Sequence, residues 1–230
     1  MLNRKADVDA LISRSEKDLA FVRSAYDKAL HDHSISAELR IDIKNLCGNL
    51  RSALDYLAKD IREKHCPTAN PNARFYFPIL PDALQYQNQM NNWFPGLRTI
   101  CIDMWDYLET IQPYHPTCAW LGKFNRLNNE NKHESLVAQT RTETHRVNVN
   151  FGSGSVNWDP SAVKFGPGVF IGGVPVNPNT QMPVPHPSQT VQKIIWVDFK
   201  FDGLDESAIA LLENSMAGIR HIVADTYKCL

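Results

Sequence analysis

The chain has 230 residues and a formal net charge of −1, with 43% hydrophobic and 21% charged residues. This length allows one large domain or two small ones with a substantial core, and the composition is ordinary for a globular protein. The charge does not indicate a strongly basic nucleic-acid binder, although a local basic patch is compatible with it. No run of about 18 apolar residues is present, and the first residues lack the apolar segment of a signal peptide. We therefore expect a cytoplasmic protein with no membrane span.

The first quarter of the chain has the apolar spacing of two long helices. Apolar residues recur at three- and four-residue steps over residues 7–31 and again over 37–64. Ser34 and Ser36 are candidate N-caps of the second helix. Two long helices joined by a short turn form an antiparallel hairpin. Gly48 weakens the second helix by about 1 kcal/mol relative to Ala, and we expect it to let another helix approach closely.

The second helix also carries a charged pair, Arg51 and Asp55, at i,i+4 spacing. Such a pair is most often a surface ion pair that contributes a few tenths of a kcal/mol. Arg before Asp is the less favourable order for the helix itself, which favours a target outside the helix.

Shorter helices are predicted next. Residues 65–81 form a proline-rich linker whose aromatic residues are expected to pack into the helices as an extended segment. Asp82 caps a helix that runs to about residue 92, and Pro95 is expected in the first turn of another that runs to about 111. A further helix opens at residue 117.

After residue 133 the period changes from helical to extended. Apolar and polar residues alternate over 146–151, and 136–144 is the expected hairpin partner of that strand. The segment 152–156, GSGSV, is interpreted as a hairpin loop, and 191–201 has the strongest strand pattern. A last helix follows from about 204.

The fold class predicted from this order is α+β and mostly α. We expect an antiparallel helical bundle over residues 1–135, a small antiparallel β element over 136–203, and a C-terminal helix over 204–230 that packs back on the bundle.

The polar end of the helix over 117–136 is the strongest candidate site. Arg126 and His133 are seven residues apart, which places them on one stripe of a continuous helix about 10 Å apart, with Glu130 between them. Histidine can transfer protons near neutral pH, and arginine is a fixed cationic fork suited to phosphate. This pair is the minimum needed to cleave RNA without a metal: a base for the 2′-hydroxyl and a cation for the phosphorane.

The neighbouring polar residues can support this chemistry. Asn128, Asn131 and Lys132 can fix a substrate or the histidine tautomer. We also expect Arg51 or Asp55 to approach the stripe from the neighbouring helix. The alternative is a polar helix end that caps and pairs internally.

The cysteines do not form a disulfide framework, because the five are an odd number and widely scattered. His115 and Cys118 have a spacing that suits a metal, but a zinc site needs about four converging ligands and no second pair is visible. No cofactor is predicted. A hydrolase with a metal held by His115, Cys118 or nearby carboxylates is a third alternative.

The sequence RLNNENKH, from Arg126 to His133, together with the earlier LRSALDYLA, resembles the HEPN superfamily and a broad set of uncharacterised bacterial proteins. The resemblance covers about residues 37–135. It implies a homodimer in which the Arg-His motifs of two chains form a composite cleft that cleaves RNA without metal, as in toxin and phage-defence ribonucleases. His133 would then transfer the proton and Arg126 would contact the phosphate, with Glu130 and Asn131 as supporting polar groups. Leu127 departs from the pattern, since active members usually carry a polar residue there.

Two functions follow from the sequence. The first is a metal-independent endoribonuclease, with RNA and a second copy of the chain as partners and with neither DNA nor a membrane. The second is a non-catalytic helical module for dimerisation or for binding a ligand or protein, in keeping with the HEPN-like domains that are inactive.

Overall fold

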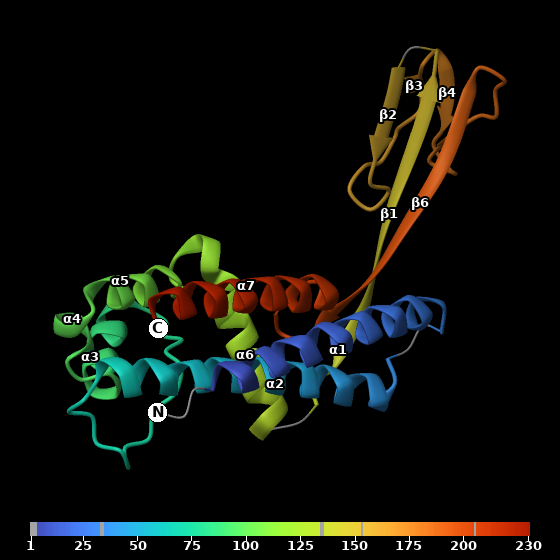
Figure 1. Ribbon diagram of the computed structural model, residues 1–230. Helices are drawn as coiled ribbons and strands as arrows, with labels where there is room; N and C mark the ends of the chain where they lie inside the picture. The colour runs from blue at the N-terminus through green and yellow to red at the C-terminus, as the bar shows by residue number, and fades with distance from the viewer. Residues whose placement is uncertain (1–3, 33–34, 134–135, 153, 205) are drawn as a thin grey trace. The chain divides into compact units, whose positions relative to one another are not determined.

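The computed structural model in Figure 1 describes residues 4–32, 35–133, 136–152, 154–204 and 206–230; within these ranges the side chains of 29–32, 132–133, 144 and 194–197 are outside the description. The fold is α+β, with the β element before the last helix, as predicted. The chain divides into two compact units, residues 1–140 with 200–230, and residues 141–199. Within the described ranges, no helix has the length and apolar character needed to cross a membrane.

The two long helices are confirmed as α1 (Lys5–Asp32) and α2 (Ala37–His65). Ser36 caps α2, because its hydroxyl accepts a hydrogen bond from the backbone N–H of Leu39 at 3.1 Å. The apolar stripe of α2 is fully buried, and α2 contacts α1, α4, α6 and α7. This central helix is therefore the one against which α1, α4, α6 and α7 pack (Figure 1).

The shorter helices are α3 (Ala83–Trp93), α4 (Leu97–Ile100), α5 (Ile102–Thr110), the 3₁₀ turn η1 (Pro116–Cys118) and α6 (Ala119–His133). Asp82 caps α3 as predicted. The single helix predicted from Pro95 to residue 111 is wrong. Gly96 adopts φ +83° and Cys101 leaves the helical region at φ −147°, so the segment divides into α4 and α5.

The last helix, α7 (Ala208–Cys229), begins four residues later than predicted because Ser207 is its N-cap. Its buried face contacts α6, α1 and α2. Gly218 of α7 lies against the indole of Trp120 from α6: a Cβ built at Gly218 would stand 2.1 Å from Cζ2 of that ring. The close contact between α6 and α7 therefore depends on a residue without a side chain.

The β unit contains two small groups of strands. In the first, β1 (Gln139–Phe151) lies between β2 (Gly154–Trp158) and β6 (Gln189–Phe201); in the second, β4 (Val174–Asn177) lies between β3 (Phe170–Ile171) and β5 (Met182–Pro183). The buried cluster consists of Val147, Val149, Trp158, Ile171 and Val176.

The hairpin predicted between 136–144 and 146–151 is wrong. Residues 139–151 form one continuous strand, and its antiparallel partner is β2, with Val147 opposite Trp158 and Val149 opposite Val156. No turn-forming residues stand between 144 and 147, whereas Gly152 has φ +47° and reverses the chain. The predicted loop 152–156 therefore contributes its second half to β2.

Candidate functional site

The predicted arginine lies on the exposed face of α6. The Arg126 side chain is 54% exposed, and its Nε donates to Oε1 of Glu130 at 2.7 Å. Its Nη1 donates to the backbone carbonyl of Gly203 at 3.1 Å. Glu130 is thus brought to Arg126 as predicted, and the guanidinium is held by one carboxylate and one carbonyl.

The backbone of Lys132 and His133 belongs to the last turn of α6. Their side chains lie outside the described part of the structure. The joint Arg126–His133 site therefore stays a prediction.

The two asparagines predicted to support that site point to the interior instead. Asn128 is 3% exposed and Asn131 is 7% exposed. Asn131 accepts a hydrogen bond from the backbone N–H of Val137 at 3.0 Å, while its buried Nδ2 has no partner in the described residues. Asn131 therefore fixes the chain just after α6, since it bonds the backbone there.

Asn128 is the second buried amide of α6, and it lines a groove between three helices. No hydrogen bond joins the Asn128 side chain to the described residues, and its amide atoms are not among the buried atoms without a partner, so the amide opens onto the groove. The groove has a volume of about 470 Å³. Its lining comprises Arg14 and Asp18 of α1, Lys44, Asn45, Gly48, Asn49 and Ser52 of α2, and Asn128 of α6. We call this surface the three-helix groove.

Every residue of the three-helix groove is polar or glycine, which is unusual between packed helices. Asp18 forms an ion pair with Arg14 at 2.8 Å and accepts a longer bond from Asn49 at 3.5 Å. Lys44 has no ion pair within the described chain. The groove thus has an excess of one positive charge, together with amide and hydroxyl groups that can bond a ligand.

Gly48 forms part of the floor of the groove. A Cβ built at Gly48 meets no atom within 4 Å. The expectation that Gly48 lets another helix approach closely is therefore wrong, since the position faces open space. The missing side chain leaves room in the groove instead.

The Arg51–Asp55 pair is a buried clamp on the extended segment before α3. Oδ1 of Asp55 accepts the backbone N–H of Phe77 at 2.9 Å, and Nη2 of Arg51 donates to the carbonyl of the same residue at 3.2 Å. Arg51 also donates to Oδ1 of Asn125 at 3.2 Å. The pair does point outside its helix, but its targets are Phe77 and Asn125 and not Arg126. We therefore assign it to folding.

Gln112 completes this clamp from the end of α5. Its Oε1 accepts from the backbone N–H of Leu80 at 2.9 Å, and its Nε2 donates to the carbonyls of Pro78 and Leu108 at 3.2 and 2.6 Å. Backbone groups of Phe77, Pro78 and Leu80 are therefore bonded by side chains of α2 and of the segment just after α5, as an irregular buried segment requires.

The alternative of a metal at His115 and Cys118 gains no ligands from the fold. Nε2 of His115 is buried without a partner, and the thiol of Cys118 donates weakly to the carbonyl of Thr110 at 3.8 Å. Within the described ranges, no group of three His, Cys, Asp or Glu side chains converges to hold a metal ion.

Sequence reasoning missed most of the three-helix groove. A signal was present, because Asn45, Gly48, Asn49 and Ser52 recur at three- and four-residue steps and form a polar stripe on α2. Nothing in the sequence showed that Asn128 of α6 and the ion pair of α1 would face that stripe.

Comparisons with protein-family models, curated proteins and solved structures give no match to this chain.

Proposed function

We propose that the helical unit is a non-catalytic binding module whose three-helix groove takes a hydroxyl-rich ligand with one negative charge, of the sugar-acid class. The observation that carries the proposal is the amide of Asn128, 3% exposed and unpaired within the described chain, on the wall of a groove without apolar lining. The amide faces the groove, where a ligand hydroxyl or carboxylate can bond it.

The chemistry of the lining selects the ligand class. Asn45, Asn49 and Ser52 offer donors and acceptors at the spacing of one helix face, which suits vicinal hydroxyl groups. Lys44 supplies the charge that a single carboxylate would neutralise. No aromatic side chain lines the groove, so a nucleobase would find no ring on which to stack.

The test uses glucuronate as the probe and glucose as its neutral comparator. At about 0.3 kcal/mol per heavy atom, a ligand of this size binds with a Kd of about 1 mM, which calorimetry or ligand-observed NMR measures. Gly48→Gln places a long side chain into the open groove and should abolish binding. The matched control Ala20→Gln adds the same side chain to an exposed position of α1 outside the groove and should leave the Kd unchanged.

Asn128→Leu separates a binding role from a folding role. Because the amide has no partner within the described chain, its replacement by a side chain of similar volume should preserve or raise the free energy of unfolding while glucuronate binding falls about tenfold. Equal binding of glucuronate by wild type and Gly48→Gln, or no saturable binding by wild type, would refute the proposal.

The second candidate function is the metal-independent ribonuclease, with a homodimer of HEPN-like helical bundles as the active form. It is favoured by the exposed guanidinium of Arg126, which Glu130 and the carbonyl of Gly203 hold in one orientation on α6. In this proposal His133 takes the proton of the 2′-hydroxyl and Arg126 stabilises the phosphorane. Incubation of the chain with single-stranded RNA in EDTA should give cleavage that both Arg126→Ala and His133→Ala reduce at least about 100-fold. Intact RNA after incubation with the folded wild-type chain would eliminate this candidate.

A further inference from the structure

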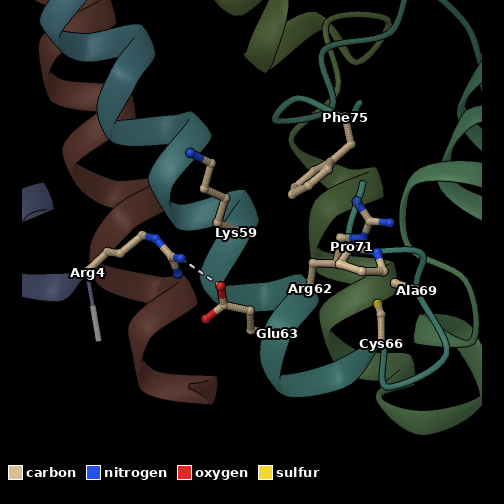
Figure 2. A pocket seen from close by; sticks show the side chains of 8 residues that line it. All are labelled: Arg4, Lys59, Arg62, Glu63, Cys66, Ala69, Pro71 and Phe75. Carbon is tan, nitrogen blue, oxygen red and sulfur yellow. Dashed lines mark hydrogen bonds and ion pairs between the residues drawn. The ribbon is translucent and has the colours of Figure 1, made fainter. Parts of the chain in front are cut away.

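A second pocket lies at the C-terminal end of α2. Figure 2 shows it between Arg4, which precedes α1, the last turns of α2, and the loop that follows α2. Its volume is about 340 Å³. Arg4, Lys59, Arg62 and Glu63 supply its charged groups, while Phe75 and Pro71 are prominent in its apolar wall.

Arg62 is a buried cation without a counter-ion. The residue is 6% exposed, and its Nη2 and Nη1 donate to the carbonyls of Asn70 and Ala73 at 2.8 and 3.4 Å. Its Cζ stands 4.2 Å from the centre of the Phe75 ring, so the guanidinium lies against an aromatic ring. All these partners are neutral, and no carboxylate lies within 4.0 Å of Arg62 in the described chain. Burying a charge is costly unless an opposite charge accompanies it.

The acidic groups nearby are already engaged. Glu63 and Asp60 bind the guanidinium of Arg4, at 2.6 and 2.9 Å. The hydrogen bond from Arg4 lowers the pKa of Glu63, so this carboxylate is committed to that ion pair. Burial raises the pKa of the Cys66 thiol to about 11, and the thiol therefore stays neutral beside Arg62.

The charge count of the pocket selects a monoanion. Arg4, Lys59 and Arg62 line the pocket, and Glu63 is the carboxylate among the lining residues. Asp60 lies outside the lining but also pairs with Arg4, and with both carboxylates counted one positive charge is left in excess. A single carboxylate neutralises that excess, whereas a phosphate dianion would overcompensate it. The wall supplied by Phe75 and Pro71 further requires an apolar body on the ligand.

We infer that this pocket binds a small monocarboxylate with an aromatic or branched apolar body. Arg62 has five N–H groups, and two of them have partners within the described chain. The ligand carboxylate bonds the remaining N–H groups of Arg62 and the ammonium of Lys59, which lies one helical turn earlier. The body of the ligand packs on Phe75 and Pro71. The inference is independent of the three-helix groove, because the two sites share no residue.

The experiment titrates the full chain with phenylacetate by calorimetry or ligand-observed NMR, beside phenylacetamide, its neutral isostere. Saturable binding of phenylacetate with a Kd of about 1 mM or tighter is expected, with phenylacetamide at least about tenfold weaker. Lys59→Gln should weaken phenylacetate about fivefold, since one charge-assisted hydrogen bond is lost. Lys59 is exposed and its ammonium stands 5.2 Å from the centre of the Tyr56 ring, so the variant is expected to fold.

The control is Lys17→Gln, which removes the same charge from an exposed position of α1 outside the pocket. Lys17→Gln should leave the Kd for phenylacetate within about twofold of the wild-type value. If it weakened binding as much as Lys59→Gln does, the effect would come from net charge alone, and the inference would be overturned. Equal affinity for the acid and the amide would also overturn it. So would the absence of saturation up to about 20 mM.

Discussion

The same substitution at two helical glycines should change stability in opposite directions. Ala is favoured over Gly in a helix by about 1 kcal/mol. At Gly48 of α2 the new methyl group meets nothing within 4 Å, so Gly48→Ala should raise the free energy of unfolding by about that amount. At Gly218 of α7 it would stand 2.1, 2.5 and 2.7 Å from three ring atoms of Trp120.

The clash at Gly218 is larger than the gain in helix propensity. Carbon atoms in van der Waals contact stand about 3.5–4.0 Å apart, so the indole ring would have to retreat by about 1.5 Å. Overpacking of this kind costs about 1–3 kcal/mol. The net effect of Gly218→Ala is therefore a loss of about 1 kcal/mol, which places the two alanine variants about 2 kcal/mol apart.

Urea denaturation followed by circular dichroism at 222 nm measures this difference, because the helices all belong to one compact unit. Repeating Gly218→Ala in a Trp120→Ala background supplies the decisive control. With the ring removed, the methyl group should stabilise α7 by about 1 kcal/mol, a coupling of about 2 kcal/mol. If Gly218→Ala stabilises the wild-type chain as much as Gly48→Ala does, the packing of α6 on α7 described above is wrong.

Three further predictions concern buried polar groups. Asp55→Ala leaves the buried guanidinium of Arg51 without its carboxylate and should lower the free energy of unfolding by about 3 kcal/mol in urea; a loss under about 1 kcal/mol would show that the clamp is not structural. Gln112→Leu removes three hydrogen bonds to the backbone and should cost about 2–3 kcal/mol in the same assay, whereas an unchanged midpoint would contradict the second half of the clamp. Burial lowers the pKa of His65, so the folded chain binds its proton less readily than the unfolded chain. The resulting stabilisation is complete above about pH 7.5 and is lost as the pH falls below about 6.5, and His65→Gln should flatten that decline; parallel pH profiles for both proteins would refute this.

The long helices were predictable because their signal is local. The apolar stripe of α2 and the cap at Ser36 depend on neighbours within a few residues, and both appear as predicted. The break between α4 and α5 was harder to predict from the sequence. Gly96 suits a left-handed conformation, but an apolar pattern that continues across Cys101 gives no sign that the helix ends there.

The errors in the candidate site arise from contacts between distant segments. The order of Arg51 and Asp55 correctly indicated a target outside the helix, yet nothing local shows that the target is the backbone of Phe77. Likewise the polar run that contains Asn128 was interpreted as one site. The helical periodicity of α6 instead places some of its residues on an exposed face and others, such as Asn128, on a buried face. Which face carries function depends on α1 and α2, and the sequence of α6 alone contains no information about them.

The two proposed binding sites lie on one helix, and their separation makes them separately testable. Gly48 and Arg62 are fourteen residues apart on α2, about 21 Å along its axis, which is well beyond the range at which substitutions usually couple. Both sites have one positive charge in excess, so net charge alone predicts the same preference for glucuronate and phenylacetate at each. Their linings differ, because one wall has only polar groups and glycine and the other contains Phe75 and Pro71. Gly48→Gln should therefore abolish glucuronate binding without affecting phenylacetate binding. Lys59→Gln should weaken phenylacetate binding without affecting glucuronate binding. Loss of both ligands in either variant would mean that one site, or a general charge effect, accounts for both.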